Sequence, residues 1–275
     1  MPYSTLMVHV DLDKHDEVRI QVAADLAAQL DARLIGIAAS DVALAPYFML
    51  GSEAQALIDE EHAGLKTRLT EAEQRFRQKL HNRVKQLEWR SAVDSPTGYV
   101  ARQARAADLL IVGPERGITL DPLRHLHSSD LVMQAGRPLL VVPENGAAPS
   151  LKSVLVAWKD TRESRRAVRD ALPLLTVAAN VTVVEVCEEH ELFPEAEAHV
   201  KDVTTWLAGH HVTATGMAWP ALHDAPGQID AVARDVGADL IVAGAYGHSR
   251  LGEWVFGGVT RNLLTHSKQC SLLAH

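Results

Sequence analysis

Residues 107–113 read Ala-Asp-Leu-Leu-Ile-Val-Gly, and residues 238–244 read Ala-Asp-Leu-Ile-Val-Ala-Gly. Each stretch places an acidic residue before a short apolar run and closes on a glycine, as a buried strand followed by a turn does. A further apolar run follows each stretch, at 138–143 and at 270–274. Because internal repeats of this kind mark a structural unit that occurs more than once, the sequence predicts two similar units in tandem.

Both halves alternate short β-branched runs with amphipathic helical stretches. The strands are expected near 5–10, 33–38, 88–93, 108–112 and 138–142 in the first half, and near 152–157, 181–186, 211–217, 239–243 and 270–274 in the second. The longest helix is expected near 53–86, where apolar residues recur at intervals of three and four. This alternation predicts an α/β fold, in which helices cover both faces of a parallel sheet and ligands bind beyond the carboxyl ends of the strands.

A small polar segment, 144–150, separates the two halves and has the composition of a linker. We therefore expect one domain at residues 1–145 and a second at residues 151–275. Both lengths are ordinary for a single domain with its own core.

A glycine-rich loop follows the fourth expected strand of the second half. It runs Gly244-Ala-Tyr-Gly247-His248-Ser-Arg-Leu-Gly-Glu253-Trp-Val-Phe-Gly257-Gly258-Val259-Thr260. Glycines adopt positive φ and let the backbone approach a ligand closely, and the glycines at 257 and 258 open a helical stretch whose free N–H groups attract an anion. The order of strand, loop and helix predicts a phosphate-binding loop, although it is neither a P-loop nor the dinucleotide fingerprint.

This loop resembles that of the universal stress protein family. Nucleotide-binding members of that family carry Gly, two residues, Gly, nine residues, Gly and then Ser or Thr, and Gly244, Gly247 and Gly257 match this spacing. Gly258 departs from it, because the family has a hydroxyl side chain there. The resemblance extends over both halves and implies two five-stranded, doubly wound domains related by pseudo-twofold symmetry. It also implies that the domains pair within the chain, and it leaves a homodimer open.

The resemblance gives a role to the end of the first strand as well. The family has an Asp there, near the adenine and ribose, and Asp11 holds this position in the first half. Alternatively, Asp11 caps the helix that follows it. In the second half the position is Lys159, either a phosphate ligand or a solvated loop residue. The first half lacks the loop, since Gly113 and Gly117 are one residue too far apart, so we expect one competent site, in the second half.

The expected ligand is ATP or a related adenine nucleotide, with Mg²⁺ left open as a companion ion. The site is expected to comprise Gly244, Gly247, His248, Gly257, Gly258, Val259, Thr260 and Lys159. Thr260, in the first helical turn, is placed to supply the hydroxyl that Gly258 lacks. The implied function is a stress-response protein that binds nucleotide without dedicated catalysis. Two alternatives stay open, a nucleotide-free scaffold or adaptor acting through domain pairing and protein partners, and a slow ATPase with His248 or Glu253 as its base.

Composition argues against several other classes of protein. The net charge is −8, with 16 Lys and Arg against 20 Asp and Glu up to Ala148 and 11 against 15 after it, so neither half is a basic nucleic-acid-binding module. No apolar run reaches the roughly 18 residues of a membrane span, and the N-terminus has no positive leader. We therefore expect a cytoplasmic protein that contacts neither membrane nor nucleic acid.

The cysteines and histidines do not form a recognisable metal or disulfide framework. Cys187 and Cys270 lie in apolar, strand-like runs, and we expect both to be buried and reduced. His210 and His211 are neighbours at a junction between a helix and a strand, where adjacent side chains diverge. We therefore expect no metal site and assign no catalytic residue.

Overall fold

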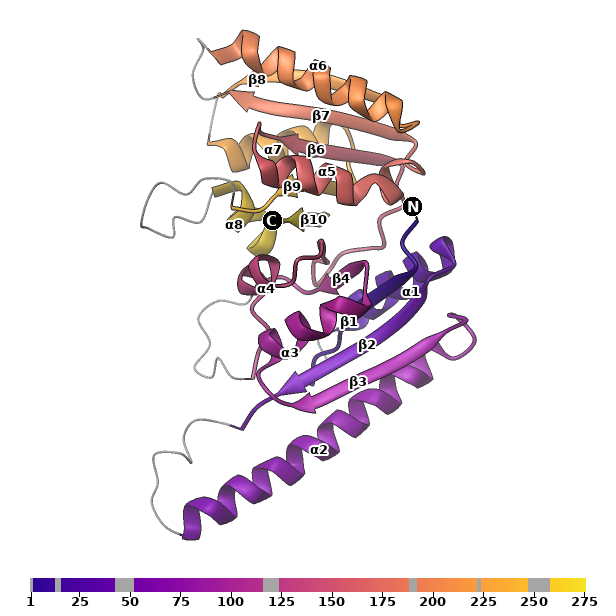
Figure 1. Ribbon diagram of the computed structural model, residues 1–275, viewed down its shortest axis with the longest axis vertical. Helices are drawn as coiled ribbons and strands as arrows, with labels where there is room; N and C mark the ends of the chain where they lie inside the picture. Colours follow the sequence, from indigo (N-terminus) through magenta and orange to yellow (C-terminus); the bar gives the residue numbers. More distant parts are fainter. Residues whose placement is uncertain are drawn as a thin grey trace. The chain divides into compact units, whose positions relative to one another are not determined.

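The computed structural model describes residues 2–12, 16–42, 52–115, 124–187, 192–221, 224–246 and 258–275. The chain divides into two compact units, Tyr3–Arg137 and Met1–Pro2 with Pro138–His275, whose elements are labelled in Figure 1. We call them the N-terminal unit and the C-terminal unit. The division falls before the strand expected at 138–142, whereas domain limits at 145 and 151 stay a prediction.

The N-terminal unit alternates strands and helices. Its strands are β1 (Thr5–His9), β2 (Arg33–Ser40), β3 (Leu87–Val93) and β4 (Leu109–Val112), and its helices are α1 (Glu17–Leu30), α2 (Ser52–Leu80), α3 (Pro96–Gln103) and α4 (Ser128–Gln134). The strands are parallel and lie in the order β3-β2-β1-β4. Met7 of β1 is in register with Ile35 of β2 on one side and with Leu110 of β4 on the other.

The C-terminal unit repeats this arrangement and adds two strands to it, β5 and β10. Its strands are β5 (Leu139–Val141), β6 (Ser153–Trp158), β7 (Asn180–Cys187), β8 (Ala214–Pro220), β9 (Leu240–Gly244) and β10 (Cys270–Ala274), and its helices are α5 (Arg162–Leu175), α6 (Phe193–Gly209), α7 (Ala225–Asp235) and α8 (Gly258–Thr265). The order is β5-β10-β9-β6-β7-β8. β6 to β10 are parallel, and β5 pairs antiparallel with β10, with Leu140 opposite Leu272.

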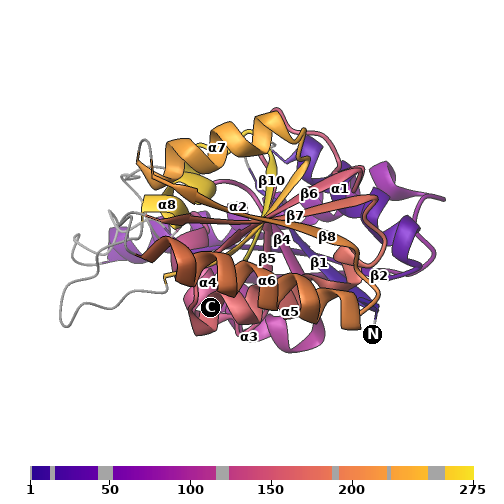
Figure 2. The ribbon, with the colours of Figure 1, turned by 90° about the horizontal axis from the view of Figure 1, so that it is seen from above.

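Both units wind their strands in the same way, because β6, β7, β8 and β9 repeat the places of β1, β2, β3 and β4. The chain moves outward through the first three strands and then returns to the other side of the first, so its helices cover both faces of the sheet. Figure 2 shows α7 on one face of the C-terminal strands and α5 and α6 on the other. The α/β class and the tandem, doubly wound arrangement are therefore confirmed. The switch point lies between β1 and β4 in one unit and between β6 and β9 in the other.

The core of the N-terminal unit shows how α2 is fixed to its sheet. Phe76 of α2 is fully buried and packs against Trp89 of β3, with ring centroids 5.4 Å apart. Gly36 of β2 lies beneath both rings, and a Cβ there would come within 2.7 Å of each. The glycine in this strand therefore makes room for two aromatic rings, which explains its place between Ile35 and Ile37.

Two expected boundaries are wrong, each beside a residue in the left-handed region. The helix expected near 53–86 ends at Leu80, and Asn82 follows with φ 64°. Asparagine tolerates this conformation better than most residues, so it stops the helix. The strand expected at 211–217 spans Ala214–Pro220, because α6 continues to its end at residue 209 and His211 then turns the chain with φ 63°.

The acidic residue of the repeated motif, Asp108 or Asp239, forms hydrogen bonds with the backbone at the start of β1 or β6. The Asp108 carboxylate accepts hydrogen bonds from the N–H groups of Ser4 and Thr5, at 2.8 and 3.0 Å. The Asp239 carboxylate accepts one from the N–H of Lys152, at 3.3 Å. These bonds join the start of β1 to β4 and the start of β6 to β9, which accounts for the recurrence of the acid in the sequence.

Cys270 is expected to stay unreactive while the protein is folded. Its side chain is 2% exposed at the start of β10, and its thiol contacts the carbonyl of Ala147 at 3.6 Å. Burial raises the pKa of this thiol to about 12. At pH 8 only about one thiol in 10,000 is then the reactive thiolate. A charged disulfide reagent should label Cys270 only after denaturation, as peptide mapping would detect; labelling in native buffer at the denatured rate would contradict this.

Candidate functional site

The candidate site of the C-terminal unit lies at the carboxyl ends of β6 and β9, beside the switch point. Ala157 of β6 is in register with Ala243 of β9. Gly244 and Lys159 follow these residues, so the chain leaves the sheet at neighbouring points. The structure thus brings the segment after the first strand of the second half next to the glycine loop, at the edge where ligands of such sheets bind.

Thr260 ties the start of α8 to the end of β9. Its side chain is 4% exposed, and its hydroxyl donates to the carbonyl of Gly244 at 3.4 Å and accepts from the N–H of Tyr246 at 3.3 Å. The first turn of α8 is therefore held at the carboxyl end of β9. Because a hydroxyl carries one proton and this one goes to Gly244, Thr260 positions the helix and has none left for a phosphate.

A glycine is required at 244 because the start of α5 packs directly against it. A Cβ at this position would lie 2.6 Å from the backbone nitrogen of Ser164 and 2.8 Å from the carbonyl carbon of Glu163. The side chain of Thr161 caps α5 by accepting from the N–H of Ser164 at 3.2 Å. The close backbone approach expected at Gly244 is therefore made by the protein's own helix.

Gly258 and Val259 form the first turn of α8. Gly258 is exposed, Val259 is half-buried, and Gly258 does not have the positive φ that would demand a glycine. A Cβ on Gly258 would lie 3.2 Å from Cγ of Pro226, in α7, which is a tight contact. The other expected loop residues, Gly247, His248, Glu253 and Gly257, lie outside the described residues.

A buried acid near Lys159 was missed by the sequence analysis. Glu185 of β7 is 8% exposed and in register with Trp158, and its carboxylate lies 3.2 Å from Nδ1 of His199, on α6. Burial raises the pKa of Glu185, although the neighbouring His199 opposes this. Lys159 itself is exposed. The signal for Glu185 was an acidic residue within the otherwise uncharged run 180–187.

The described ranges contain neither a metal-binding cluster nor a membrane-spanning helix. Within them, no group of three or more His, Cys, Asp and Glu side chains is arranged to hold a metal ion. Among the same residues, no helix combines the length and the apolar character needed to cross a membrane.

Comparison with known proteins gives one match to a family model. Residues 221–274 match the model described as the Universal stress protein family. This segment contains α7, β9, the glycine loop, α8 and β10, and so includes the loop side of the candidate site. The match shows that this segment is similar to the universal stress protein family. No curated protein matches the sequence of this chain.

Solved structures extend the likeness in fold to the whole chain. A universal stress protein from Archaeoglobus fulgidus has a TM-score of 0.75 at 12% identity, covering 98% of this chain and 97% of that chain. A functionally unknown protein from Pseudomonas aeruginosa has a TM-score of 0.61 at 15% identity, covering 99% and 92%. A universal stress protein solved in complex with cAMP covers 53% of this chain and 100% of its own at 21% identity, with a TM-score of 0.37.

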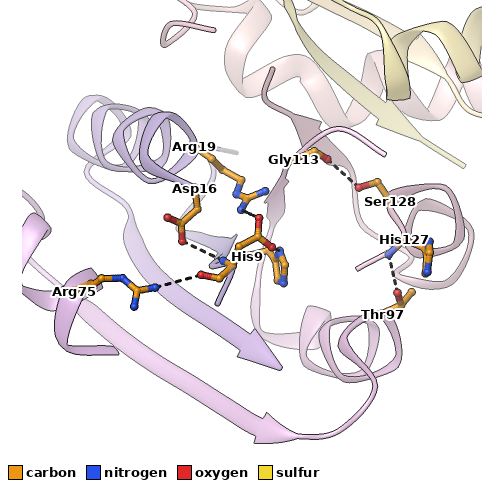
Figure 3. Close-up of polar contacts among 9 residues, drawn as sticks. His9, Asp16, Arg19, Arg75, Thr97, Gly113, His127 and Ser128 are labelled. Carbon is orange, nitrogen blue, oxygen red and sulfur yellow. Dashed lines mark hydrogen bonds and ion pairs between the residues drawn. The ribbon is translucent and has the colours of Figure 1, made fainter. Parts of the chain in front are cut away.

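The N-terminal unit has a polar cluster at its own switch point (Figure 3). The Asp11 carboxylate pairs with Nη2 of Arg19 at 2.9 Å and lies 3.5 Å from Nδ1 of His9. Asp16, not Asp11, is the N-cap residue of α1, so the capping alternative for Asp11 is wrong. The Asp16 carboxylate instead accepts from the N–H of Asp11 at 3.1 Å, and Nη2 of Arg75 donates to the Asp11 carbonyl at 3.3 Å.

A second part of this cluster lies where α4 begins. The Glu115 carboxylate accepts from the N–H of Ser129 at 2.8 Å and lies 3.0 Å from Nδ1 of His127. The Ser128 hydroxyl donates to the carbonyl of Gly113 at 3.0 Å, the bond drawn in Figure 3. The N-terminal unit therefore supplies a carboxylate of its own to the helix after its fourth strand.

Replacing Asp16 by Asn is expected to change how stability depends on pH. Burial raises the pKa of Asp16 above 3.8, although Arg19 opposes this. The folded protein therefore holds this proton more tightly than the unfolded chain, and the stability that it contributes at low pH is lost as the pH rises through the folded pKa. Asn keeps an oxygen for the Asp11 N–H but does not titrate. The free energy of unfolding of Asp16→Asn, relative to wild type, should increase as the pH rises above about 4.

Urea unfolding at a series of pH values measures this difference directly. The free energy of unfolding of Asp16→Asn minus that of wild type should rise with pH, because only wild type has a carboxyl at position 16 that loses its proton. A difference that stayed constant or fell over the same range would show that the carboxyl is not desolvated in the folded protein.

Proposed function

We propose that the C-terminal unit binds ATP or a closely related adenine nucleotide as a ligand that it does not turn over. The observation that carries this proposal is the pair of hydrogen bonds of the Thr260 hydroxyl, which donates to the Gly244 carbonyl at the end of β9 and accepts from the Tyr246 N–H just after it. They hold the first-turn N–H groups of α8 at the switch point, and a helix start at such a place favours a phosphate.

The charges around this turn support an anionic ligand. Lys159 is exposed at the end of β6, the strand next to β9, and its long stem allows the ammonium group to follow a phosphate. Among the described residues, no carboxylate is bonded to the N–H groups of Gly258 or Val259, whereas Glu115 has that position at α4. The family-like spacing of the loop glycines supports an adenine nucleotide over other anions.

The proposal also covers a companion metal ion, nucleic acid, the cell compartment and the pairing of the two domains. A companion Mg²⁺ would be held mainly by phosphate oxygens and water, the ligands it usually keeps. Nucleic acid is not a proposed partner, because both halves of the chain carry more acidic than basic residues. The two buried, free thiols fit a reducing compartment such as the cytoplasm. The pairing of the two domains within the chain stays part of the proposal.

Native mass spectrometry of the purified full-length chain, followed by calorimetric titration with ATP, ADP and GTP, tests the proposal. We expect one adenine nucleotide per chain, with hydrogen-exchange protection in Gly258–Thr265. Discrimination against GTP would show that the base is recognised as well as the phosphates. Absence of binding at about 1 mM nucleotide would overturn the proposal and leave the scaffold as the function to pursue.

A further inference from the structure

The two switch points differ in what lies against the glycine after the fourth strand. In the C-terminal unit, the backbone of Ser164 approaches Gly244, and Ser164 is three residues after Thr161, the N-cap of α5. In the N-terminal unit, Arg19 is three residues after Asp16, the N-cap of α1. The two positions therefore correspond, and a small side chain in one unit is replaced by a guanidinium in the other.

Arg19 occupies the centre of the N-terminal cluster. Its side chain is 6% exposed and runs from α1 toward Gly113, where an added Cβ would overlap its Nη1 atom (Figure 3). Its other terminal nitrogen, Nη2, pairs with Asp11 at 2.9 Å. A buried arginine is costly unless it is paired, so the Asp11 carboxylate and the Arg19 guanidinium stabilise each other's burial.

Other residues of the cluster reach the N-terminal switch point from α2, from the start of α1 and from the start of α4. Arg75 reaches across from α2 to the Asp11 carbonyl, and the Asp16 carboxylate accepts from the Asp11 N–H. On the side of α4, Glu115 accepts from the Ser129 N–H, a group that an anionic ligand takes in an open site. The chain thus pairs the acid at the end of β1, Asp11, with the Arg19 guanidinium, and it places the Glu115 carboxylate at the start of α4.

We propose that the N-terminal switch point is closed by the chain's own side chains, with Arg19 and Glu115 in the positions that a ligand would need. Arg19 is a positioning residue that holds Asp11 and the loop after β1 against Gly113. This inference does not depend on nucleotide binding by the C-terminal unit, because the carboxylates of Asp11, Asp16 and Glu115 already have partners within the N-terminal unit.

Chemical rescue of Arg19→Ala in the full-length chain tests the proposal. Removal of the guanidinium leaves the Asp11 carboxylate half-buried without its cation, so the thermal midpoint should fall. Methylguanidinium at millimolar concentration should restore part of this loss in a saturable manner, whereas methylammonium should restore less because it lacks the planar pair of donors. Wild type should show no such gain.

Arg83→Ala is the matched control. Arg83 pairs with Asp25 in the same unit but is 41% exposed in its side chain, so its loss should lower the midpoint little and leave nothing to rescue. Equal responses of the two variants to methylguanidinium, or no saturable response of Arg19→Ala, would overturn the proposal.

A double variant keeps the test decisive if Arg19→Ala does not fold. Asp11→Asn with Arg19→Ala removes both buried charges, so it should unfold at a higher urea concentration than Arg19→Ala alone. A double variant that was less stable than the single one would overturn the pairing. Binding of a second ATP per wild-type chain, with exchange protection at Ser128–Gln134, would overturn closure itself.

Discussion

Glutamate at position 258 is expected to lower the affinity of the C-terminal unit for ATP by about 100-fold. A carboxylate in the first turn of α8 would take the N–H groups that the proposed phosphate needs and would repel its charge, which together cost about 2–4 kcal/mol. Each 1.4 kcal/mol corresponds to a tenfold change in the dissociation constant. The substitution is compatible with the backbone, since Gly258 is exposed and lacks a positive φ.

Gly258→Gln is the control, because glutamine has nearly the same shape as glutamate without its charge. Both side chains would meet Cγ of Pro226 in the same way, so the difference between the variants reports the charge alone. Gly258→Ser should instead tighten binding about five- to tenfold by donating a hydroxyl that Thr260 does not have free. Calorimetric titration of the three variants compares them. Equal affinities of the Glu and Gln variants would mean that no phosphate binds at the start of α8.

Gly244→Ala is expected to lower the free energy of unfolding by about 2–3 kcal/mol, the upper part of the range of about 1–3 kcal/mol that is typical of overpacking. The new Cβ would lie 2.6 Å from the backbone nitrogen of Ser164, and backbone atoms cannot rotate away as a side chain can. Relief therefore requires α5 to move away from β9, which disturbs a buried strand and the capped start of the helix.

Gly64→Ala provides the matched control for this effect. Gly64 lies within α2 and has no atom within 4 Å of the place where a Cβ would be added. Alanine there should raise the free energy of unfolding by about 0.5–1 kcal/mol, because it favours the helix over the unfolded chain. Urea unfolding of both variants measures the contrast. A Gly244→Ala protein as stable as wild type would show that α5 does not constrain this glycine.

The fold was predictable because its signals are local and occur twice. The repeated run from Ala107 to Gly113 and from Ala238 to Gly244 contains the acid, the buried strand and the turn that the structure uses in both units. Strand and helix periodicities then fixed the α/β class and the edge of the sheet where a site would lie. Among the site residues, Lys159 and Gly244 were expected together and do lie at neighbouring strand ends.

The details of the site depend on contacts between distant segments, which no local pattern records. Arg19 has the sequence neighbours of an ordinary helix residue, and only the packing of α1 beside Gly113 makes it buried. Glu115 gains its role from α4, and Thr260 was expected to face a ligand, whereas its hydroxyl bonds to β9. Gly244 was expected to let a ligand approach the backbone, which stays a prediction, and the neighbour that requires a glycine there is α5.

The pairing of β5 with β10 has a practical consequence for any work on separated halves. A fragment that starts at residue 151, after the linker, lacks β5 and leaves one side of β10 with unpaired backbone N–H and C=O groups. An apolar edge such as Cys270–Ala274 is a template for strands of other molecules, so this fragment should self-associate and precipitate. A fragment that starts at Pro138 keeps its own protecting strand, and the choice of cut thus decides whether the isolated half remains a monomer.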